Sequence, residues 1–357
     1  MHFYESSIIT TVDGLHCQVY GNEHPLSSIL VKPKYIPTDR LHSDILPYRF
    51  LAGRKMNRLN LWADKNELKR YIEEFKIKYP EYIYRSTMHE DDRLFFSIPI
   101  NRIERIYFPK KGLSELMGMP IKSLDEHLKT VYEFVALLLK SGLRIDDLGV
   151  TYSTLMGHYL SSISDINIVV YGKENFWKLM SYLETASHPL LRWKTEKEWM
   201  DFRQRRNRFL IFGKEQFLRD MQRKKSEGYF NETLFVIFAV ENENEVWFKW
   251  NQESYNALGL VSVEGTVVDN FSSVVRPGFY EIKDSKIIEG YENVPVKQIV
   301  FYSRDYCSLA NPDEKISACG ILEKVTPKNG KQYHRVCVGY FDSYITDRRE
   351  KEFIKVI

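Results

Sequence analysis

The residues with the clearest chemical potential lie in one short stretch, residues 149–172. This stretch reads as a strand, a tight turn with Tyr152 and Ser153, a short polar helix, and a second strand that carries Asp165 and Asn167. Side chains two positions apart on a strand point to the same face. Two carboxylates placed in this way can bridge a pair of divalent ions, and a serine hydroxyl with nearby amides can hold phosphates. The layout is therefore typical of a site for metal ions and a triphosphate.

The stretch resembles the DNA polymerase β-like nucleotidyltransferase superfamily, in which a Gly-Ser turn is followed by Asp-x-Asp on a strand. Tyr152-Ser153 occupies the Gly-Ser position, and Asp165-Ile166-Asn167 occupies the Asp-x-Asp position. More narrowly, the chain is similar to a group of archaeal proteins described only as predicted nucleotidyltransferases. The resemblance implies a nucleotide-binding turn at Tyr152 and Ser153, and it implies Asp165 as the remaining ligand of a metal such as Mg²⁺.

Two features depart from the superfamily pattern and weaken the metal site. Asn167 offers a carbonyl oxygen without charge, and the ring of Tyr152 stands where a glycine leaves room for phosphate. A third carboxylate would come from a later strand, and the candidate strand RFLIFGKEQFLR offers Glu215 and Asp220 without a convincing fit. His158 is either a catalytic base or an ordinary polar residue of the short helix. We therefore expect the fold to be kept and catalysis to be impaired or absent, with Mg²⁺ as a cofactor only if the site is active.

A second notable feature is the concentration of positive charge between Arg192 and Lys225. This segment contains twelve basic and five acidic residues, a local net charge of +7, whereas the whole chain carries +3. Aromatic residues interleave with the basic ones, and phosphate neutralisation combined with stacking is how sequence-tolerant nucleic-acid binding works. The alternative is a solvated helix whose aromatic residues face the core. The candidate nucleic-acid contacts are Arg192, Lys194, Arg203, Arg205, Arg206, Arg208, Lys214 and Arg219.

The rest of the sequence predicts an α+β or α/β chain in three parts. Residues 1–115 read as a β-rich module with helices, in which Asp13-Gly14 marks a hairpin turn and a helix spans Asp64–Lys78. Residues 116–230 form the nucleotidyltransferase-like mixed sheet with helices, one of which follows a capping box that begins at Ser123. Residues 231–357 are a succession of short strands, among them EVWFKW. They predict a C-terminal β-barrel, for which an OB-like barrel is one option.

Composition and hydropathy narrow the functional classes. The chain has no apolar run of about 18 residues or more and no secretory signal, so we expect a cytoplasmic protein without membrane partners. The leading hypothesis is a pseudoenzyme with a nucleotidyltransferase fold that binds RNA or an RNA–protein assembly. The alternatives are an active metal-dependent nucleotidyltransferase that acts on RNA or protein, and a protein-interaction scaffold without nucleic acid. The oligomeric state does not follow from the sequence.

Overall fold

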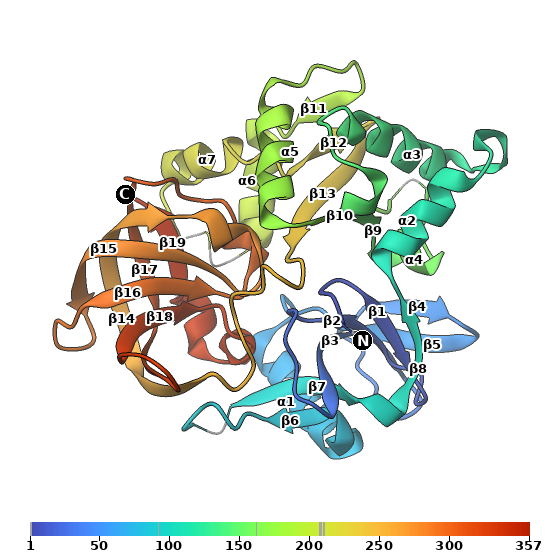
Figure 1. Ribbon diagram of the computed structural model, residues 1–357. Coiled ribbons are helices and arrows are strands. Elements are labelled where there is room, and N and C mark those ends of the chain that lie inside the picture. The colour runs from blue at the N-terminus through green and yellow to red at the C-terminus, as the bar shows by residue number, and fades with distance from the viewer. Residues whose placement is uncertain (1, 92, 162, 207–208, 210) are drawn as a thin grey trace.

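The computed structural model shows an α+β protein built from three β-sheets that follow one another along the chain (Figure 1). It describes residues 2–91, 93–161, 163–206, 209 and 211–357. The N-terminal sheet, the central sheet with most of the helices, and the C-terminal sheet lie side by side around a common centre (Figure 1). Within the described part of the chain, no helix is long and apolar enough to cross a membrane.

The first sheet holds the N-terminal third of the chain. Its strands are β1 (Ile8–Thr11), β2 (His16–Val19), β3 (Ser28–Pro37), β4 (Tyr48–Leu51), β5 (Arg54–Arg58), β6 (Ile83–Arg85), β7 (Leu94–Pro99) and β8 (Ile103–Tyr107). The main path runs β4-β5-β3-β2-β1-β8, and β7 joins β3 to β6. β1 and β2 form the hairpin expected at Asp13-Gly14, where Gly14 has a φ of 84° that suits glycine.

Helix α1 (Lys65–Lys78) packs against this sheet and confirms the helix expected at Asp64–Lys78. The carboxylate of Asp64 accepts the backbone amides of Asn66 and Glu67, which would otherwise lack partners at the start of the helix.

The second sheet forms the centre of the chain and has the order β11-β12-β13-β10-β9. Its strands are β9 (Leu148–Val150), β10 (Ile166–Tyr171), β11 (Leu191–Trp193), β12 (Glu227–Phe230) and β13 (Thr233–Val240). The accompanying helices are α2 (Pro109–Gly118), α3 (Glu126–Leu139), α4 (Tyr152–Met156), α5 (Lys173–Thr185), α6 (Glu196–Arg205) and α7 (Lys214–Gln222). The strand, turn, helix and strand expected in residues 149–172 are confirmed as β9, α4 and β10.

The two faces of the central sheet have different neighbours. Ile166, Ile168 and Val170 of β10 are buried in one apolar core with residues of α3 and α5. Because side chains alternate along a strand, Asn167 projects from the opposite face, toward the space between the sheets. β13 runs parallel to β10, so the central sheet extends beyond residue 230, where the strand-rich sequence suggested that it ends.

The capping box expected at Ser123 is wrong. α3 begins after Asp125, whose carboxylate accepts the amide of Leu128 at 2.9 Å. The hydroxyl of Ser123 donates instead to the carbonyl of Pro120 at 2.7 Å, within a preceding 3₁₀ turn. Asp125 is the better cap because it lies directly before the first helical residue.

The segment RFLIFGKEQFLR, expected as a strand, is helical in its second half. Phe217, Leu218 and Met221 recur at helical spacing in α7, and all three are buried in the core of the C-terminal sheet. Glu215 and Asp220 therefore lie on a helix, and they do not extend the sheet that carries Asp165.

The third sheet closes on itself. Its strands are β14 (Glu253–Asp269), β15 (Gly278–Glu289), β16 (Val296–Phe301), β17 (Lys315–Pro327), β18 (Tyr333–Val338) and β19 (Phe353–Val356). The order is β14-β15-β16-β18-β17-β19, and β14 also pairs with β17, so five strands form a ring to which β19 is added. The predicted C-terminal barrel is confirmed as a closed ring of strands. EVWFKW is a loop and not a strand, since Trp247 bonds through its amide to Glu241 and through its indole nitrogen to the Pro277 carbonyl.

Candidate functional site

The four motif residues meet in one cavity. Tyr152, Ser153, Asp165 and Asn167 line a hollow of about 380 Å³ that the central sheet shares with the first sheet. β3 supplies the opposite wall, and the turn and start of α4 place Tyr152 and Ser153 beside it. The sequence-predicted motif is therefore brought together in space. We call this hollow the basic cavity, because five of its lining residues are cations: Lys32, Lys34, Arg49, Arg58 and Arg206.

Tyr152 has a glycine-like backbone and a large side chain. Its φ is 56°, in the left-handed region that bulky residues rarely adopt and that costs about 1–3 kcal/mol. The ring lies 3.5 Å from the ammonium of Lys34, and the hydroxyl donates to the side-chain oxygen of Gln18 at 3.0 Å. Arg304 donates to the same hydroxyl at 3.4 Å. The turn thus keeps the conformation that glycine favours, while the ring occupies the space that a glycine would leave open.

Asp165 and Asn167 lie at the edge of β10 but do not form a carboxylate pair. The side-chain nitrogen of Asn167 donates a hydrogen bond to the backbone oxygen of Asp165 at 3.2 Å. The cleft around Asp165 desolvates its carboxyl group and raises its pKa, and the negative charge of Glu227 acts in the same direction. The cations Arg58, Lys194 and Lys34 oppose this increase without reversing it.

Glu227 is the second carboxylate of this region, and sequence reasoning missed it. Glu227 lies opposite Val236 in β13, and Val236 lies opposite Asn167 in β10, so all three share a face of the sheet. Its carboxylate is already paired with Lys194. Glu215 and Asp220, the candidates from the sequence, lie on α7, where Asp220 is buried beside Arg223 at 3.7 Å.

The residues present do not fit a pair of divalent ions. Among the described residues, no three His, Cys, Asp or Glu side chains lie close enough together to hold a metal. Asp165 faces the ammonium of Lys34 and the guanidinium of Arg58, which compete with a cation for its charge. Two-metal chemistry needs carboxylates around both ions, and one carboxylate with one amide does not supply them.

The cations of the basic cavity carry unbalanced charge. Lys32 and Lys34 alternate with apolar residues along β3 and share one face of the strand. In the part of the chain that the structure describes, no carboxylate lies within ion-pair distance of Lys32, Lys34, Arg58 or Arg206. Arg206 instead lies over the ring of Trp62 at 4.6 Å. Arg58 is exposed, but Lys32, Lys34 and Arg206 are partly buried. Partly buried charge without a partner is costly, and an anionic ligand would compensate it.

The surroundings of Lys32 lower its pKa. Burial lowers the pKa to about 7, and three nearby guanidinium groups act in the same direction. They belong to Arg276, Arg206 and Arg304, and the carboxylate of Asp305 opposes them. Burial also holds the pKa of Lys34 well below its usual range. A bound phosphate would favour the charged form of both lysines.

His158 also lines the basic cavity. Its Nε2 lies 3.3 Å from the hydroxyl of Tyr35, and the two rings meet edge to face. Burial and then the charge of Lys34 lower its pKa to about 4. The imidazole is therefore neutral at neutral pH and is a weak base.

Of the described residues in the basic segment from Arg192 to Lys225, Arg206 lines the basic cavity. Several of its other cations form ion pairs within the chain: Arg192 pairs with Glu198 and Glu232, Lys194 with Glu227, Lys214 with Glu196, and Arg219 lies beside Asp220. Arg203 and Arg205 donate to the backbone carbonyls of Phe212 and Asp201. Trp199, Phe209 and Phe212 are buried in the core. Arg208 lies outside the described residues. A nucleic-acid face along this segment stays a prediction.

The basic residues of the cavity that sequence reasoning missed come from the first sheet. They are Lys32, Lys34, Arg49 and Arg58. A signal for the first two was present, because a strand whose lysines alternate with apolar residues, as in LVKPKYI, places both charges on one face.

Comparison with known proteins adds a relative but no activity. The fold and site define an α+β protein of three sheets with a basic cavity between them. Over 349 residues the chain is 26% identical to an uncharacterized protein, MJ1086, from Methanocaldococcus jannaschii, and the match covers 96% of this chain and 98% of that protein. No model of a known protein family matches the chain, and no solved structure matches it.

Proposed function

We propose that the protein is a nucleotidyltransferase-like protein that no longer transfers nucleotides and that binds RNA, or an RNA–protein assembly, through the basic cavity. One observation carries this proposal: among the described residues, five basic side chains and a single carboxylate line the same hollow. Phosphate esters are the ligands that such a cluster recognises, because several cations can contact their oxygens at once.

Three further features support the proposal. The layout of residues 149–172 places a turn, a short helix and an acidic strand edge around the cavity. Metal-dependent transfer requires a second carboxylate and room for the phosphates. Asn167 lacks the charge of that carboxylate, and the ring of Tyr152 fills the room. The closed ring of five C-terminal strands is consistent with an OB-like barrel, an architecture that binds oligonucleotides in many proteins.

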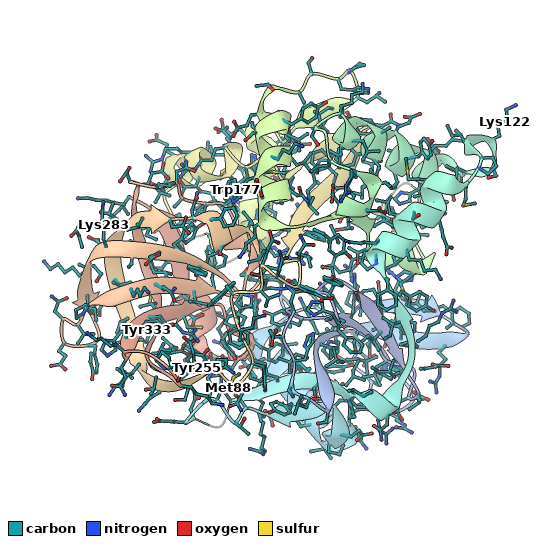
Figure 2. All side chains as sticks on the ribbon, viewed as in Figure 1. Met88, Lys122, Trp177, Tyr255, Lys283 and Tyr333 are labelled. Carbon is teal, nitrogen blue, oxygen red and sulfur yellow. The ribbon has the colours of Figure 1, made fainter. Side chains whose placement is uncertain are left out.

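Removing two cations of the cavity is expected to weaken RNA binding about tenfold. The variant Arg58→Gln with Arg206→Gln removes two unpaired guanidinium groups, and for single-stranded RNA the plot of log affinity against log salt should flatten by about 1.4. The measurement is fluorescence anisotropy with a short single-stranded RNA of mixed sequence at several salt concentrations. The matched control is Lys122→Gln with Lys283→Gln, which removes the same charge from opposite sides of the molecule (Figure 2). An equal loss in both variants, or no loss in either, would contradict a specific role for the cavity.

Divalent metal is expected to leave the protein unchanged. Because the site holds one carboxylate among cations, Mg²⁺ or Mn²⁺ should not shift the melting temperature, and labelled nucleotides should not be incorporated into pooled RNA. In the variant Asn167→Asp with Tyr152→Gly, the restored charge and space should produce a metal-dependent rise in melting temperature. Robust incorporation by the natural chain that disappears in Asp165→Ala would show instead that the enzyme is active.

A further inference from the structure

A second hollow adjoins the basic cavity and has a different character. It measures about 210 Å³ and shares four lining residues with the basic cavity: Gln18, Lys32, Tyr152 and Arg206. Its walls come from the first sheet and the C-terminal ring. They carry many aromatic side chains, together with the charged residues Arg276, Arg304 and Asp305; the aromatic residues include Tyr20, Trp62, Phe95, Tyr302, Phe341 and Tyr344. We call it the aromatic cavity. The two hollows meet at a junction where Lys32 and Arg206 line both of them.

Several rings of the aromatic cavity are held in fixed orientations. Tyr20 and Tyr302 lie nearly parallel, with 8° between their planes and 6.3 Å between their centroids. Trp62 is held edge to face against Tyr344, and the guanidinium of Arg206 lies over its ring. Aromatic side chains held in this way are the kind of surface on which proteins stack nucleobases.

Gln18 supplies a hydrogen-bond donor at the junction of the two cavities. The residue is 4% exposed, and its side-chain oxygen accepts the hydroxyl of Tyr152. Its side-chain nitrogen has no hydrogen-bond partner within the described residues. Buried polar groups are nearly always paired in folded proteins. An unpaired amide that lines a hollow therefore points to a ligand that accepts a hydrogen bond from it.

We infer that the aromatic cavity binds the base of a nucleotide whose phosphates lie in the basic cavity. This inference rests on the proposed function and narrows its ligand to a nucleoside phosphate, either a free nucleotide or the phosphorylated terminal nucleotide of an RNA. Lys32 and Arg206 contact the phosphates at the junction, the rings of Trp62 and its neighbours stack on the base, and Gln18 donates to an acceptor atom of the base or ribose.

The experiment compares ATP with inorganic tripolyphosphate by isothermal titration calorimetry on the full chain. The two ligands present similar phosphates, so ATP should bind about tenfold more tightly because only ATP can stack. Trp62→Leu should remove this preference for ATP over tripolyphosphate, whereas Trp62→Phe should retain it. Trp177→Leu is the matched control, since Trp177 lies on α5 and bonds to the carbonyl of Phe271, away from both hollows (Figure 2).

The outcomes separate the inference from the proposed function. Equal affinity for ATP and tripolyphosphate in the natural chain would overturn the base subsite while leaving the phosphate site intact. Binding of neither ligand would overturn both. Competition against ATP then identifies the source of the nucleotide. A 5′-phosphorylated linear RNA that competes indicates a chain end, and its failure to compete indicates a free nucleotide. Equal competition by the same RNA in circular form would overturn the assignment, because a closed chain has no terminal phosphate.

Discussion

Replacing Lys32 with methionine is expected to make the protein more stable at neutral pH and, at the same time, a weaker binder of phosphate ligands. The lysine is recessed beside three guanidinium groups, and its pKa falls from 10.5 to about 7 in the folded state. A shift of this size corresponds to roughly 4 kcal/mol of unfavourable interaction for the charged form near neutral pH. Methionine keeps the length and apolar character of the side chain without the charge.

The pH dependence gives this prediction its sign. Between about pH 7 and pH 10.5 the unfolded chain holds a proton on Lys32 that the folded chain has lost. The contribution of Lys32 therefore makes the natural protein more stable as the pH rises through this window, and the methionine variant lacks that contribution. The charged groups that face the lysine are Arg276, Arg206, Arg304 and Asp305, and they remain in both proteins.

The measurement is urea denaturation of both proteins across this pH range, together with calorimetric titration of tripolyphosphate. Lys283→Met is the matched control because Lys283 lies on the outer surface (Figure 2). A methionine variant that is less stable and binds tripolyphosphate as tightly as the natural chain would show that Lys32 is a packing residue and not a ligand contact.

Replacing Glu323 with glutamine is expected to destabilise the fold by about 3–5 kcal/mol, because one partner of a buried ion cluster loses its charge. Glu323 on β17 accepts hydrogen bonds from Arg93 at 2.7 Å and from Arg335 at 2.8 Å. All three side chains are almost fully buried. Arg93 precedes β7, so the cluster joins the first sheet to the C-terminal ring. The glutamine would remove the carboxylate partner of Arg335, whereas Arg93 would keep its ion pair with Asp91 at 2.9 Å.

The rings around the cluster do not replace the lost carboxylate. Arg335 lies 3.9 Å from the ring centroid of Tyr255, and Arg93 lies 4.4 Å from that of Tyr340. Cation–π contacts of this kind contribute about 0.5–2 kcal/mol, less than the expected loss. Burial raises the pKa of Glu323, but the two arginines outweigh burial and hold the pKa below its usual value. The stabilisation is therefore present at neutral pH and is lost as the pH falls through that lowered pKa.

Urea denaturation at neutral pH tests this prediction. The control replaces all three charged residues, as Arg93→Met, Glu323→Leu and Arg335→Met, and should be much closer to the natural stability because no buried charge of the cluster is left unpaired. Asp91, the other partner of Arg93, is 43% exposed and remains in contact with water. A glutamine variant within 1 kcal/mol of the natural protein would contradict the prediction. Binding of tripolyphosphate by the folded variant should be unchanged, since neither cavity includes Glu323.

The sequence alone determined the local elements and the core of the motif. Asp13-Gly14 specified a hairpin and the stretch Asp64–Lys78 specified α1, because turn and helix preferences act between residues close in the chain. The alternation and spacing of residues 149–172 specified β9, α4 and β10, which bring Tyr152, Ser153, Asp165 and Asn167 to one hollow.

Tertiary structure alone decided which charges are free to bind a ligand. Arg192 and Lys194 looked like nucleic-acid contacts, but the pairing of β11 with β12 and the turn after β12 bring Glu227 and Glu232 beside them. The sequence did not indicate Lys34 and Arg58 as site residues. In the structure they lie near Asp165 on another sheet, more than a hundred residues away in sequence. A charge is neutralised or left free by what lies within a few ångströms of it. In a chain of three sheets, that neighbourhood is set by how the sheets pack and not by the order of residues.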